Sequence, residues 1–79
     1  MTMDTLAVTC LVPAETPPLM AASMRERAIA AWYWRVEAHP EIRPVPWSKP
    51  FAWWEDEGGP AGQWVAAGLV RKTRASNGE

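Results

Sequence analysis

The sequence lacks the residues on which disulfide-stabilised and zinc-binding domains depend. It holds one cysteine, Cys10, and one histidine, His39, in 79 residues. A single cysteine excludes an intramolecular disulfide framework, and the two residues together leave no ordinary zinc ligand set. We therefore expect no metal and no other cofactor, and we expect Cys10 to be a small buried hydrophobic residue rather than a reactive thiol.

The chain also lacks an excess of charge and a long apolar run. Its formal net charge is −1, so the sequence encodes no overall attraction to nucleic acid or to an anionic membrane. No apolar stretch approaches the roughly 20 residues that a membrane span needs, and no basic leader precedes an apolar segment. The simplest expectation is a cytoplasmic protein without a membrane partner.

No group of residues has the spacing of an enzyme site. His39 lies at the end of a predicted helix, and no second base or nucleophile is placed to act with it. The carboxylates at 55–57 are consecutive, and since successive strand residues face opposite ways, they indicate a solvated turn rather than a metal site. The glycine-rich segment 58–62 lacks the Lys-Ser/Thr of a phosphate loop. We expect a protein that is not an enzyme.

Length and composition favour one small folded domain. Hydrophobic residues make up 48% of the chain and charged residues 22%, which is typical of a globular protein. A chain of this size has room for a single core. We expect one domain over residues 1–79, with residues 1–4 and 74–79 frayed.

The pattern of apolar residues predicts an α+β fold of order β-α-β-β. The apolar and β-branched run 5–12 predicts a strand, and 19–39, without internal glycine or proline, predicts a long helix that ends before Pro40. Two aromatic and β-branched runs, 51–57 and 63–73, flank the glycine-rich segment and predict a hairpin. The helix is then packed on a three-stranded antiparallel or mixed sheet.

Two segments leave alternatives open. Four prolines between residues 40 and 50 forbid a helix and discourage a paired central strand, so this segment is expected to be an extended crossover. Residues 60–74 favour a strand, but a helix competes because Pro60 opens a segment that contains alanines. Gly62 and Gly68 count against the helix.

Tryptophan is the outlier of the composition. Six tryptophans lie within 33 residues, and the chain has only four leucines for a conventional core. Each indole buries on the order of 200 Å², and a small domain has few enclosed positions. Some indoles are expected to replace the missing core residues, and at least one is expected to stay on the surface, where tryptophan is a frequent binding anchor. The six are Trp32, Trp34, Trp47, Trp53, Trp54 and Trp64.

The predicted helix has more apolar surface than one sheet face can cover. Ile29, Trp32 and Val36 share one side, which a sheet would bury. A flank with Met24, and Trp34 on the more polar side, are left over. Either a partner protein or a second copy covers them, or the proline-rich segment wraps around the helix.

These observations favour a protein that acts by binding another molecule and not by catalysis. We expect a non-enzymatic module that binds and modulates another protein, with Met24, Trp34, Trp53 and Trp54 as its protein-binding residues. A helix on one sheet face leaves the other bare, which favours a homodimer. Frequent Ala, Arg and Pro with two lysines hint at a GC-rich bacterial or phage genome, hence an accessory protein of such an origin. The alternative is a small nucleic-acid-binding regulator that uses a basic cluster near the C-terminus: Arg71, Lys72 and Arg74.

Overall fold

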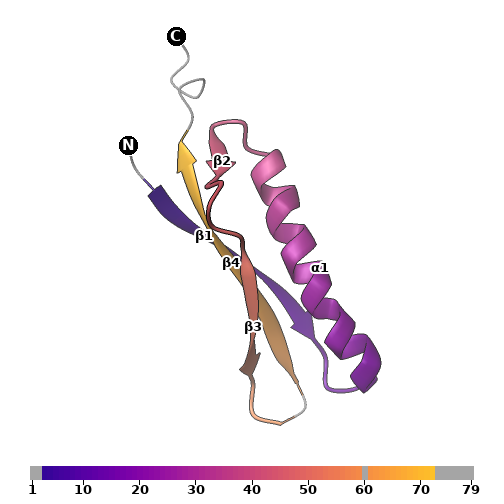
Figure 1. Cartoon of the computed structure of the whole chain (residues 1–79). Coiled ribbons are helices and arrows are strands. Elements are labelled where there is room, and N and C mark those ends of the chain that lie inside the picture. Colours follow the sequence, from indigo (N-terminus) through magenta and orange to yellow (C-terminus); the bar gives the residue numbers. More distant parts are fainter. Residues whose placement is uncertain (1–2, 60, 73–79) are drawn as a thin grey trace.

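The described part of the chain folds into one helix packed on one face of an antiparallel sheet (Figure 1). The structure, a computed structural model, describes residues 3–59 and 61–72. In chain order the elements are β1 (Met3–Val12), α1 (Pro18–Glu37), β2 (Ile42–Pro44), β3 (Phe51–Asp56) and β4 (Gly62–Lys72). The predicted α+β class is confirmed. The order differs by one element, because the short strand β2 precedes the predicted hairpin.

Strand β4 is the centre of the sheet. β1 pairs with it along the whole described length, from Met3 opposite Arg71 to Val12 opposite Gly62. The other edge of β4 is shared by two strands, β2 beside its end and β3 beside its beginning. The result is an elongated two-layer molecule of 50 × 19 × 17 Å, with α1 lying along the sheet (Figure 1).

The predicted element boundaries are close to the observed ones. β1 begins two residues before the prediction, and α1 begins at Pro18, where proline fits because its missing N–H has no helical partner. The hairpin of β3 and β4 is confirmed, and the helix considered for 60–74 is wrong for the described residues 62–72. Gly58 and Gly59 have φ of 85° and 118° in its turn, a conformation that favours glycine.

The proline-rich segment is extended, as predicted, but three of its residues form β2. Proline cannot donate a ladder hydrogen bond, and Pro44 is tolerated because β2 lies at the sheet edge. Pairing continues one residue further, since the amide of Val45 donates to the carbonyl of Leu69 at 3.1 Å. The side chain of Val45 is buried.

The core lies between α1 and the sheet, and one indole fills its middle. Trp32 is fully buried, and its Nε1–H donates to the backbone carbonyl of Leu6 at 2.8 Å. A Cβ on Gly68 would lie 2.7 Å from Cζ2 of Trp32, so the indole rests directly on the backbone of β4. Cys10, predicted to be buried, is half-buried against this core. The buried members of the cluster are Val8, Ala28, Trp32, Val36, Ala66 and Val70.

A second indole connects the N-terminal part of α1 to the sheet. The Nε1–H of Trp64, on β4, donates to the carbonyl of Ala21 in α1 at 2.8 Å. Hydrogen bonds to buried partners remove the cost of enclosing a polar N–H. Two indoles of different elements therefore hold helix and sheet at a fixed separation.

The contact between Trp32 and Gly68 predicts that even a methyl group is excluded at residue 68. In Gly68→Ala the new Cβ meets the buried ring and also Cα of Pro50 at 3.0 Å. We expect a loss of about 1–3 kcal/mol in the free energy of unfolding, measured by chemical denaturation. In a Trp32→Phe background the smaller ring gives way, and the added cost of Gly68→Ala falls. An equal cost in both backgrounds would contradict this account of the contact.

Candidate protein-binding surfaces

The six tryptophans divide into buried, half-buried and exposed groups. Trp32 is enclosed, whereas Trp54 and Trp64 are half-buried. The exposed fraction is 78% for Trp34, 69% for Trp47 and 36% for Trp53. The prediction that at least one indole stays on the surface is confirmed.

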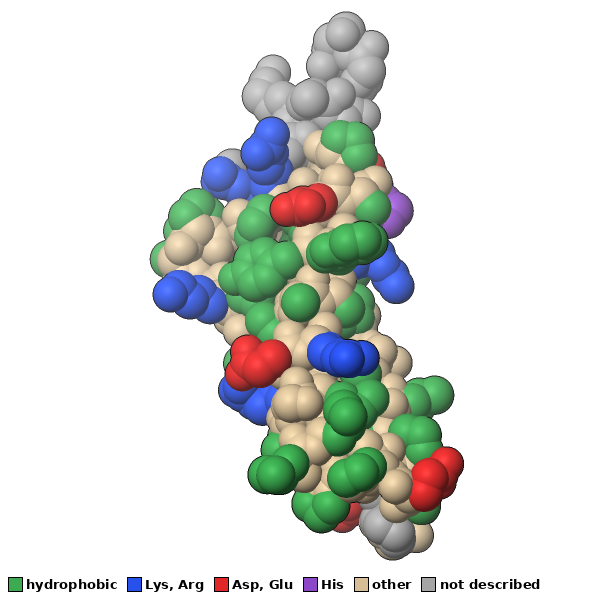
Figure 2. Space-filling model, turned by 90° about the vertical axis from the view of Figure 1, so that its right-hand side faces the viewer, with side chains coloured by type: hydrophobic (Ala, Val, Ile, Leu, Met, Phe, Trp, Pro, Cys, Tyr) green, Lys and Arg blue, Asp and Glu red, His purple; other side chains and the backbone are tan. Residues whose placement is uncertain are grey.

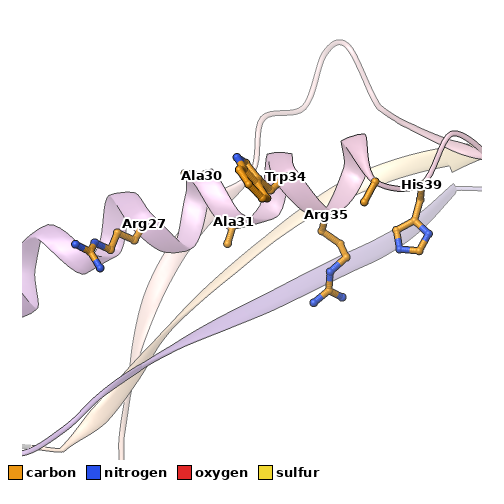
Figure 3. Close-up of a pocket in the computed structure, with 7 residues that line it drawn as sticks. Arg27, Ala30, Ala31, Trp34, Arg35 and His39 are labelled. Carbon is orange, nitrogen blue, oxygen red and sulfur yellow. The ribbon is translucent and has the colours of Figure 1, made fainter.

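Trp34 stands on the side of α1 that faces away from the sheet. Each helical residue turns the chain by roughly 100°, so Trp34 lies about 200° around the helix from buried Trp32. It belongs to a shallow depression of about 550 Å³, here called the helix surface (Figure 3). Alanines on both sides keep the helix backbone accessible. The lining residues are Arg27, Ala30, Ala31, Trp34, Arg35, Ala38 and His39.

The residues that line the helix surface include two arginines and no Asp or Glu. Along the helix axis Arg27 lies on one side of Trp34, and Arg35 and His39 lie on the other (Figure 3). Neither arginine has an ion-pair partner among residues 3–59 and 61–72. Figure 2, which views the helix side of the molecule, shows hydrophobic side chains interspersed with charged ones.

His39, at the end of this surface, has an acidic neighbour. Its Nδ1 lies 3.0 Å from Oε2 of Glu41, just beyond the helix. The pKa of Glu41 is lowered, first by a hydrogen bond from its own backbone and then by His39. Both side chains are about half exposed, so this pair orients the imidazole without burying charge.

A second apolar surface lies on the face of the sheet opposite α1, here called the open sheet face. Its most exposed aromatic side chains are Phe51, at 61%, and Trp53 on the same strand, with ring centroids 5.4 Å apart. The small side chains of Val65 and Ala67 form the floor beside them. Between Phe51 and Leu69 the surface is hollowed, with a volume of about 370 Å³.

Hydrogen bonds fix the orientation of the Trp53 indole, although this side chain is partly exposed. Its Nε1–H donates to Oε2 of Glu55 at 3.0 Å, and the amide of Gln63 donates to Oε1 of the same carboxylate at 3.0 Å. These two hydrogen bonds, that of Trp53 first, hold the pKa of Glu55 below its ordinary value of 4.5. An aromatic side chain held in place by hydrogen bonds loses less conformational freedom when a partner binds.

The four predicted protein-binding residues do not form one surface. Trp34 and Trp53 are on opposite sides of the molecule, and Met24 is half-buried. Trp54 packs edge-on against Trp64 with centroids 5.4 Å apart, and its Nε1–H donates to Oδ1 of Asp56 at 2.6 Å. Trp54 is therefore half-buried beside Trp64.

Sequence reasoning missed four exposed apolar side chains: Leu11, Leu19, Trp47 and Phe51, each more than 60% exposed. A signal existed for Phe51, because strand alternation places it on the same face as Trp53. Trp47 lies in the loop between β2 and β3, where no periodicity indicates a direction.

The basic residues of the alternative prediction do not lie together on one face of β4. Arg71 and Lys72 are neighbours in β4 and therefore face opposite ways, and Arg74 lies outside the described residues. The register instead places Arg43 of β2 directly opposite Arg71.

The described parts of the chain hold no grouping of three or more His, Cys, Asp or Glu side chains suited to a metal ion. The helix found there is not apolar enough to cross a membrane. Comparison of the chain with protein-family models, with curated proteins and with solved structures gives no match.

The hydrogen bonds to Glu55 predict a pH dependence. Since the folded chain lowers the pKa of Glu55, this carboxylate stabilises the fold above its ordinary pKa, and the contribution is lost as the pH falls through the lower folded value. A carbon-detected NMR titration should give a midpoint below 4.5 for Glu55. Trp53→Phe removes the first donor and should raise that midpoint. Trp54→Phe, which removes an indole bonded to Asp56, is the control and should leave it unchanged; equal midpoints in wild type and Trp53→Phe would refute the assignment.

Proposed function

We propose that this chain is a non-enzymatic interaction module that binds an acidic segment of another protein on the helix surface. The observation that carries the proposal is the 78% exposure of Trp34 on a well-formed helix. Burial of that indole by a partner would contribute roughly 3–4 kcal/mol of gross hydrophobic free energy. Such a side chain has the properties of a binding anchor.

The surroundings of Trp34 support an acidic partner. Arg27 and Arg35 offer guanidinium groups that bind carboxylates in a bidentate geometry. Ala30 and Ala31 leave space for a partner side chain or backbone to approach the helix. A segment with an apolar residue between Asp or Glu residues is complementary to this arrangement.

The alternative, a small nucleic-acid-binding regulator that uses Arg71, Lys72 and Arg74, stays a proposal of lower rank. Its support is the pairing of Arg43 with Arg71, which gathers two cations at one end of the open sheet face. Phosphate contacts would make the affinity fall steeply with salt, whereas an interaction anchored by the Trp34 indole would change less.

The proposal is tested by selecting binders from a random peptide library displayed on phage against the immobilised full chain. We expect selected peptides to combine an apolar residue with flanking carboxylates. Trp34→Ala should weaken their binding at least about tenfold, equivalent to 1.4 kcal/mol. Leu19→Ala is the matched control, since Leu19 is 88% exposed on the same helix but outside the helix surface, and it should bind normally.

Two results would overturn the proposal. One is that selected peptides bind Trp34→Ala as tightly as wild type. The other is that no peptide is enriched while a pool of random single-stranded oligonucleotides binds with a steep salt dependence, which would favour the regulator.

A further inference from the structure

The open sheet face carries opposite charges at its two ends. In the register of the sheet, Arg43 lies opposite Arg71 at one end. At the other end Glu55 lies opposite Gln63. Halfway between these pairs, Phe51 lies opposite Ala67. All of these positions share one face, since side chains at every second residue of a strand point the same way.

The two arginines at the basic end lie close together without a carboxylate partner in the described residues. Like charges directly opposite each other on neighbouring strands destabilise a sheet. Neither Arg43 nor Arg71 forms an ion pair within the described ranges 3–59 and 61–72. A carboxylate supplied from outside would relieve this repulsion.

We infer that the open sheet face is covered by a second copy of this chain, packed face to face with its strands running antiparallel to those of the first. The two-fold axis lies between the two sheets, perpendicular to the strands, at the level of the Phe51–Ala67 pair. This inference concerns a surface other than the helix surface, and neither depends on the other.

The register of β2 and β3 on β4 favours this position of the two-fold axis. Gln63 and Arg71 are each four residues from Ala67 on β4, so a half-turn at the level of Ala67 exchanges the two ends of the face. Glu55 and Arg43 lie on the same side of β4, and the half-turn therefore places Glu55 over Arg43 of the second copy. Sheets pack about 10 Å apart, a distance that facing Glu and Arg side chains span.

The same half-turn matches ridge to hollow. Val65, opposite Trp53, is exchanged with Leu69. The hollow of about 370 Å³ extends from Leu69 to Phe51 and Trp53 of the same chain, and Thr5, Ser48 and Lys49 complete its lining. The half-turn places the Trp53 indole of one copy over the Leu69 side of this hollow in the other. A half-turn about an axis parallel to the strands would instead bring the basic ends together, which costs energy through repulsion.

In this dimer both helices lie on the outside. The helix surface with Trp34 is on the side of α1 away from the sheet, so dimerisation leaves it accessible. Each dimer then presents two copies of the helix surface on opposite sides. Loss of the dimer and loss of peptide binding are therefore separate results.

The test uses two full-length charge variants, Glu55→Arg and Arg43→Glu, alone and mixed. Each variant alone places like charges at both contacts, so we expect the dimerisation affinity to fall at least about tenfold, measured by sedimentation equilibrium. In an equimolar mixture a heterodimer has opposite charges at both contacts. At one contact the two substituted positions face each other, and at the other the unsubstituted Arg43 and Glu55 do. Native mass spectrometry should then show a heterodimer with one copy of each variant.

Matched controls are Glu26→Arg and Arg35→Glu, both on exposed positions of α1, which should leave dimerisation unchanged. Thermal unfolding monitored by circular dichroism establishes that each variant is folded. If Glu55→Arg fails to fold because Trp53 and Gln63 lose their acceptor, Phe51→Glu replaces it, since it puts two carboxylates together at the axis and should give monomers. A wild type that is monomeric up to millimolar concentration, folded variants that stay dimeric, or a mixture of folded variants without heterodimer would each overturn the inference.

Discussion

The fold depends on one close contact, that of the Trp32 indole with the backbone at Gly68. A side chain at residue 68 would force the ring or the backbone to shift, because a Cβ would lie 2.7 Å from the ring. The indole thereby takes the space that several aliphatic side chains would fill in a conventional core, and its N–H is satisfied by the carbonyl of Leu6. Packing at this density tolerates little change in volume. At this point the Trp32 ring fills the space between helix and sheet.

This constraint explains the positions of four of the five remaining tryptophans. A single helix on a single sheet encloses a narrow layer, in which Trp32 is fully buried. Trp54 and Trp64 fit only at its end, where each is half-buried and each N–H finds an oxygen acceptor. The outer side of α1 and the open sheet face lie outside the layer, so Trp34 and Trp53 have no core to enter.

Local features of the sequence predict most of this fold. The helix, the first strand and the glycine turn follow from periodicity and punctuation, and helical projection correctly separates Trp32 from Trp34. The sequence does not show what strand pairing decides. The register places Trp54 opposite Trp64, against which it packs, and Pro44 is accommodated in β2 because that strand lies at the sheet edge. The pairing of Arg43 with Arg71 cannot be seen without the register, because the turn and β3 lie between them in the chain.

The topology also determines the charge pattern of the open sheet face. β2 and β3 use the same side of β4, because the segment after Val45 turns away and returns to that edge. Arg43 and Glu55 therefore stand in one line, on either side of the Phe51–Ala67 pair. Had β2 paired with the outer edge of β1, Arg43 and Glu55 would lie beyond opposite edges of β4. A half-turn could not then place one over the other. The complementarity of the face with itself is thus a property of the strand order as well as of the side chains.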